Sequence, residues 1–201
     1  MTMRWTLLRS LAIAAALLAG VAPAYAHGFA GPGWLHPLTG PDHMLAMLAV
    51  GAWSAQVGGR AIWIVPSAFV GAMALGGALG LVGIAVPATE VGIALSVLCL
   101  GALIALESRA AIPLAAIAVG LFGVCHGNAH GLEMPGSQSP LVYAVGFLAT
   151  TAGLHIVGAV LALLVLDRNK GRMALRLGGV ATSLAGVAFV LRLVGLPIAL
   201  A

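Results

Sequence analysis

Long apolar runs separated by short polar breaks fill most of the chain after its first 26 residues. A transmembrane helix needs about 20 consecutive, mostly apolar residues, and six runs reach or approach that length. No ten-residue segments of alternating apolar and polar residues occur, as a membrane barrel would require. The pattern therefore predicts an all-α, polytopic membrane protein, a six-helix transmembrane bundle with spans at residues 41–57, 61–82, 88–106, 112–125, 141–166 and 174–200.

The first 26 residues are typical of a cleaved signal peptide. Arg4 and Arg9 precede an apolar stretch, and Ala24-Tyr25-Ala26 fits the small-residue pattern of a cleavage site. We predict a signal peptide at residues 1–26 and one six-span transmembrane domain at residues 27–201. The mature N-terminus would then be His27, on the periplasmic side. An uncleaved first helix is the alternative.

Charged residues are scarce, and their signs are segregated. Only 7% of residues are charged and 62% are hydrophobic, with a mean hydropathy of +1.13, whereas soluble domains carry about 25% charged residues. This composition excludes a soluble enzyme, a nucleic-acid-binding protein and a disordered chain. With His27 outside, basic residues fall on inner loops, as the positive-inside rule requires of a bacterial inner-membrane protein: these are Arg60, Arg109, Arg168, Lys170, Arg172 and Arg176.

The first polar stretch covers residues 36–43 and lies at the predicted outer end of the first span. Pro37 disfavours a helical conformation of the preceding residue, so we expect His36 to be extended and its ring to fold back toward Asp42. Pro41 suits the first position of a helix. Asp42 and His43 would then lie in the first helical turn.

The second polar stretch covers residues 126–135, also on the outer side. His126 and His130 are four positions apart, and Glu133 follows three positions later, so a helix would place all three on one face. Gly127 and Gly131 weigh against a helix here, but they would let the backbone pack closely or bend around a small ligand.

Imidazole and carboxylate groups together favour a borderline divalent metal such as Ni, Co, Zn or Cu. Ionisable residues at membrane depth are costly and usually functional, so we interpret the two stretches as handling metal or protons. Glu90 is a further candidate because it lies at the outer start of the third span. His27 is another, because cleavage would expose its α-amine beside its imidazole. We interpret His155 as a hydrogen-bonded packing residue, with a metal role left open. The candidate metal ligands are His27, His36, Asp42, His43, Glu90, His126, His130 and Glu133.

Both stretches resemble motifs of the HupE/UreJ family of nickel permeases. One is His36-Pro37-Leu38-Thr39-Gly40-Pro41-Asp42-His43, and the other reads HGNAHGLEMP from His126. The signal-like start followed by His-Gly and the length of about 200 residues also match. The resemblance implies secondary uptake of nickel, or of cobalt, to supply hydrogenase or urease. It implies metal-handling roles for His36, Asp42, His43, His126, His130 and Glu133.

A permease of this kind would have the metal ion and the lipid bilayer as its partners. No P-loop sequence occurs, so we expect no ATP hydrolysis by this chain, and we predict no ATPase partner, no resident cofactor and no catalytic residue. One alternative is a membrane metalloenzyme that holds a catalytic metal with the same ligands. Another is a haem-binding membrane cytochrome, which would need histidine pairs on facing spans.

Overall fold

The computed structural model describes residues 31–196, and this part of the chain is all-helical. The predicted fold class is thus confirmed. The predicted signal peptide and His27 lie outside the described residues. The helices are α2 (His36–Thr39), α3 (Pro41–Val57), α4 (Ala61–Leu81), α5 (Thr89–Ala105), α6 (Ile112–Leu132), α7 (Pro140–Leu166) and α8 (Gly171–Leu193).

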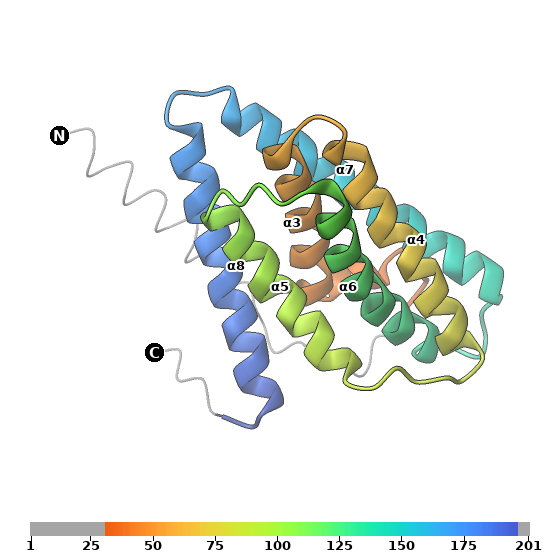
Figure 1. The fold of residues 1–201 in the computed structure, drawn as a ribbon. Coiled ribbons are helices and arrows are strands. Elements are labelled where there is room, and N and C mark those ends of the chain that lie inside the picture. The colour runs from red at the N-terminus through yellow and green to blue at the C-terminus, as the bar shows by residue number, and fades with distance from the viewer. Residues whose placement is uncertain (1–30, 197–201) are drawn as a thin grey trace.

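The six long helices run up and down, with α3 at the centre of the bundle (Figure 1). The α3–α4, α5–α6 and α7–α8 connections lie at one end, and the α4–α5 and α6–α7 connections lie at the other. Helix α4 packs most extensively on α6, α5 on α8, and α3 on α7. Because α3 also contacts α4, α5 and α8, its polar first turn is surrounded by other elements.

Within residues 31–196, four helices are long and apolar enough to cross a membrane: α4, α6, α7 and α8. Helix α5 is apolar but has only 17 residues, and α3 is equally short and carries polar groups. The protein is therefore a membrane protein, while the count of six crossings stays a prediction. The loops with the basic residues share one end of the bundle, and the two histidine stretches share the other.

Two predicted span boundaries were wrong. The fourth span does not end at residue 125, because α6 continues through the second polar stretch to Leu132. Where no water can bind free backbone groups, a helix satisfies them internally, and this outweighs the ~1 kcal/mol helix cost of each glycine. The last helix covers Gly171–Leu193 rather than 174–200. It stops at Gly195, whose φ of 72° ends the helix in a left-handed turn.

Glycines let α4 and α6 touch backbone to backbone. A Cβ atom on Gly76 would collide with the carbonyl of Val124, and one on Gly127 would lie 2.7 Å from the carbonyl carbon of Met73. Small residues allow such close approach in membranes, where lipid supplies no hydrophobic drive between helices. The glycines at this contact are Gly76, Gly77 and Gly80 on α4 and Gly123, Gly127 and Gly131 on α6.

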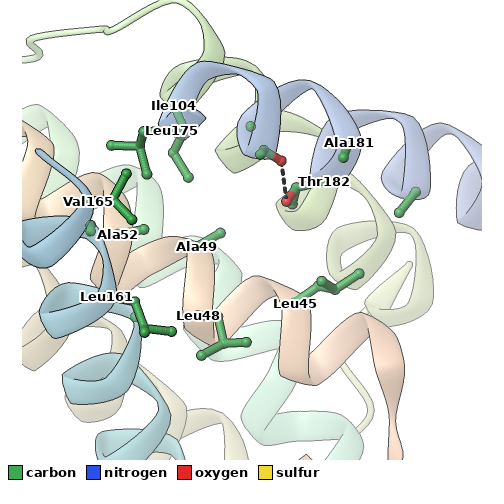
Figure 2. Close-up of a pocket in the computed structure, with 15 residues that line it drawn as sticks. Leu45, Leu48, Ala49, Ala52, Ile104, Leu161, Val165, Leu175, Ala181 and Thr182 are labelled. Carbon is green, nitrogen blue, oxygen red and sulfur yellow. Dashed lines mark hydrogen bonds between the residues drawn. The ribbon is translucent and has the colours of Figure 1, made fainter. Parts of the chain in front are cut away.

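An apolar pocket of about 280 Å³ lies between α3, α7 and α8. Leu45 and Leu48 from α3 line it together with Leu161 and Val165 of α7 and Ala181 and Thr182 of α8 (Figure 2). The one hydroxyl in its lining, on Thr182, is already bonded to the Gly178 carbonyl at 3.0 Å. The lining contains no imidazole, carboxylate or thiolate to bind a metal ion, and this pocket is not the candidate site.

Candidate metal centre

Four histidine rings from three helices meet at the end of the bundle opposite the basic loops, the predicted outer end. The ring of His43, on α3, has its centroid 4.7 Å from that of His126 and 4.8 Å from that of His130, both on α6. The ring of His36, on α2, lies 4.6 Å from His130 and 6.0 Å from His43. The structure thus brings together two motifs separated by some 90 residues of sequence. Long side chains bridge them, since α6 itself packs mainly on α4.

His36 differs from its predicted conformation. It begins the short helix α2 rather than lying extended, because Pro37 falls in the first helical turn, where a missing N–H costs nothing. Its ring does not pair with Asp42. Instead its Nε2 atom lies 3.0 Å from Oε2 of Glu133, just beyond α6. This ion pair ties α2 to the end of α6.

Asp42 fixes the orientation of the neighbouring His43 ring. Its Oδ1 atom accepts hydrogen bonds from the backbone N–H of His43 at 2.8 Å and from the ring Nδ1 at 2.9 Å. An ionised carboxylate only accepts, so the proton of a neutral His43 ring is on Nδ1. The lone pair is then on Nε2, which is buried and has no hydrogen-bond partner among the described residues. A carboxylate behind an imidazole is the usual support of a metal-binding histidine.

Ser96, on α5, fixes the orientation of the His126 ring, a role that the sequence analysis did not predict. The Ser96 hydroxyl donates to the Ile93 carbonyl at 2.6 Å and lies 3.0 Å from Nε2 of His126. Having used its only proton, this hydroxyl must accept from Nε2–H. The free lone pair of His126 is therefore on Nδ1, another buried atom without a partner in the described part of the chain.

His130 is buried against an aromatic ring. Its ring stacks on Phe147 of α7, with centroids 4.9 Å apart and an interplanar angle of 6°. It is fully buried, and within residues 31–196 neither ring nitrogen has a hydrogen-bond partner. A buried polar atom without a partner costs about 1–3 kcal/mol, so this cluster is stable only with a compensating gain. Binding a cation would supply one.

Asn128 holds the outer ends of α4, α5 and α6 together. Its side chain is fully buried. The amide nitrogen donates to the Ile84 carbonyl at 2.8 Å, and the amide oxygen accepts from the backbone N–H of Val86 at 2.8 Å and from the hydroxyl of Thr89 at 3.3 Å. Because Asn128 lies between His126 and His130, these bonds anchor both rings to the α4–α5 connection.

Negative charge surrounds the rings. Asp42 and Glu133 bond directly to histidines, and Glu90, on the first turn of α5, interacts electrostatically with His43. In residues 31–196 no three His, Cys, Asp or Glu side chains already form a coordination sphere. The rings pack edge to face, so binding an ion requires them to rotate. The arrangement can attract a divalent cation and offer it imidazole nitrogens.

Comparison with known proteins identifies the family. The chain matches the HupE/UreJ protein family over residues 6–189, nearly its whole length. The chain belongs to the HupE/UreJ family. It is also 45% identical over 183 residues to "Protein HupE" of Rhizobium leguminosarum bv. viciae, an alignment that covers 88% of this chain and 95% of that protein. No solved structure matches the chain.

The HupE/UreJ family is a transporter-type family, associated with nickel and cobalt uptake for hydrogenase and urease. Membership therefore supports a membrane protein with a role in metal transport. The motifs recognised in the sequence coincide with the histidine cluster of the structure, whereas His155 lies outside it. His27 lies beyond the described residues, so its metal role stays a prediction.

Proposed function

We propose that this protein takes up Ni²⁺, or Co²⁺, across the bacterial inner membrane and supplies metalloenzymes such as hydrogenase or urease. The observation that carries the proposal is the cluster of His36, His43, His126 and His130, in which Nε2 of His43, Nδ1 of His126 and both ring nitrogens of His130 are buried and have no hydrogen-bond partner among the described residues. The cluster would face the periplasm, since the basic loops lie at the opposite end of the bundle.

The first step is capture at the outer end. The carboxylates of Asp42, Glu90 and Glu133 attract the hydrated cation. Nε2 of His43 and Nδ1 of His126 then replace water, at the distances of about 2.0–2.1 Å usual for imidazole on a borderline metal. We assign Asp42 and Glu133 two roles: they hold His43 and His36 in orientation, and they compensate the charge of the ion.

The membrane potential supplies the driving force. A potential of 100 mV, negative inside, is worth about 2.3 kcal/mol per charge and so about twice that for a divalent ion. Facilitated entry therefore needs no ATP. A metal-binding site that holds the ion weakly, at several stations, also releases it quickly.

The test is uptake of radioactive nickel by proteoliposomes with an imposed inside-negative potential. The parent protein should accumulate nickel, and dissipating the potential should abolish accumulation. Asp42→Asn keeps the acceptor oxygen for His43 but removes the charge, and Asp42→Ala removes both. We expect uptake at limiting nickel to fall about 10–100-fold, the range usual for the support of a metal ligand, and further for Asp42→Ala than for Asp42→Asn.

The matched control is Asp167→Asn, a change of the same chemistry at an exposed residue at the other end of the bundle. It should transport nickel at the parental rate. The proposal fails if the parent protein does not accumulate nickel. It fails equally if Asp42→Ala protein, present in the membrane at the parental level, transports nickel like the Asp167→Asn control.

A further inference from the structure

His155 is a buried histidine that the outer cluster does not include. It lies 15 residues into α7, about 22 Å from the outer end of that helix at a rise of 1.5 Å per residue. It is only 2% exposed, and within the described residues neither Nδ1 nor Nε2 has a hydrogen-bond partner. The expected hydrogen-bonded packing role is therefore not what the structure has. Two unsatisfied ring nitrogens are costly to bury unless something binds them part of the time.

One aromatic ring separates His155 from the outer cluster. The ring of Phe69, on α4, has its centroid 5.4 Å from that of His126 and 5.1 Å from that of His155. The side chains of a helix point toward its N-terminus, which for α7 is the outer end. The His155 ring is thus directed toward the cluster, with Phe69 between them.

Two weaker potential metal ligands, a hydroxyl and a thioether, lie one helical turn from His155 in the direction of the outer cluster. The buried hydroxyl of Thr151 donates to the sulfur of Met47 at 3.3 Å. A hydrogen bond from a hydroxyl to a thioether is weak, so the Thr151 oxygen and the Met47 sulfur lose little when they bind a cation instead. On the other side, His155 and Ser67 line a cavity of about 410 Å³ between α4 and α7. Apart from these two residues the lining is apolar.

We propose that His155 is a second, deeper ligand station for the transported divalent cation, which reaches it from His126 when the Phe69 ring moves aside. The inference rests on the proposed function. A single imidazole, with only Met47 and Thr151 nearby, binds a divalent ion more weakly than the outer cluster does. Such a gradient favours passage inward, because conduction requires binding that is weak enough to release the ion.

A thiolate introduced at this position would report directly whether nickel arrives there. The variant is His155→Cys in a background carrying Cys99→Ala and Cys125→Ala, so that the new thiol is the only one. The matched control is Gly153→Cys in the same background, since a side chain at Gly153 meets no atom within 4 Å and is not directed at Phe69. Nickel added to the purified proteins should give the near-ultraviolet nickel–thiolate charge-transfer band with His155→Cys only. No band with His155→Cys, or equal bands in both proteins, overturns the proposal.

Transport supplies an independent measurement that does not depend on the cysteine variant folding. His155→Gln keeps the size and polarity of the side chain but is a poor ligand. We expect equilibrium nickel binding at the outer cluster to be unchanged and the initial rate of uptake to fall about tenfold or more, equivalent to ~1.4 kcal/mol on the barrier. A packing role alone would lower the melting temperature and leave the rate per folded molecule unchanged, and that result overturns the proposal.

The two proposals fail in different ways. If the parent protein does not accumulate nickel, the proposed function is wrong. If the parent accumulates nickel and Asp42→Ala does not, while His155→Gln transports at the parental rate, only the deeper station is wrong.

Discussion

Replacing Gly127 by Ala tests whether backbone contact between α4 and α6 sets the geometry of the metal site. The new Cβ atom would lie 2.7 Å from the carbonyl carbon of Met73 and 2.8 Å from the backbone nitrogen of Gly77. Ordinary contact begins at 3.4 Å, so the two helices must separate by at least the difference of 0.7 Å. Neither neighbouring atom belongs to a flexible side chain that could move instead.

The separation has two consequences. Overpacking a close contact costs about 1–3 kcal/mol, which for a chain of this length lowers the melting temperature by about 2–4 °C per kcal/mol. Gly127 also lies between His126 and His130, and a binding site must be held to within about 0.5 Å. We therefore expect Gly127→Ala to lower nickel affinity by about tenfold or more, the sensitivity seen when the support of metal ligands is disturbed.

The assay pairs thermal unfolding of the purified protein with nickel uptake by proteoliposomes. Gly120→Ala is the matched control, because it makes the same change on the same helix. There the new Cβ atom would lie 3.8 Å from its nearest neighbour, Cβ of Ala72, which is an ordinary van der Waals contact. Since Ala favours helix over Gly by about 1 kcal/mol, the control should melt no lower than the parent. If Gly127→Ala melts and transports like Gly120→Ala, the reasoning about the interface is refuted.

Three further changes follow from the hydrogen bonds of the site. Ser96→Ala removes the acceptor that places the proton of His126 on Nε2. Nickel affinity, measured by equilibrium binding, should therefore fall about tenfold. The control is Ser183→Ala, which removes another hydroxyl that faces α5. Asn128→Ala leaves the Val86 N–H and the Ile84 carbonyl unsatisfied, and the melting temperature should drop by the equivalent of about 1–3 kcal/mol; an unchanged value would mean that water replaces the amide. Glu133→Gln keeps the shape of the pair with His36 but removes its charge, so uptake should fall while the melting temperature stays within about 2 °C of the parent, and parental uptake would contradict the role given to that charge.

The sequence predicted the helices well where an apolar run ends at a polar break. The span predicted at residues 41–57 coincides with α3, those for α4 and α7 differ by one residue at one end, and that for α5 differs by one residue at each end. The error at α6 has a clear cause. Gly127 and Gly131 disfavour an isolated helix, but the need to satisfy backbone groups inside the bundle and the close contact with α4 favour one here.

The site was predictable in its membership but not in its pairing. Histidines and carboxylates near the same end of two spans indicate a common site, whereas the choice of Glu133 rather than Asp42 as the partner of His36 depends on how α2 turns. Ser96 went unnoticed because a serine in an apolar run is ordinary, and its role follows only from a 3.0 Å approach by an imidazole 30 positions away. The unsatisfied nitrogens of His155 likewise depend on packing around α7.

The glycine contact between α4 and α6 also limits how this sequence can diverge. When two side chains touch, an enlargement on one helix can be balanced by a reduction on the other. Here the atoms opposite Gly127 and Gly131 belong to the main chain, which every residue shares and no substitution can shrink. No substitution on the facing helix can therefore compensate for a larger residue at these positions. Homologues that keep this helix pair should have glycine at both of them.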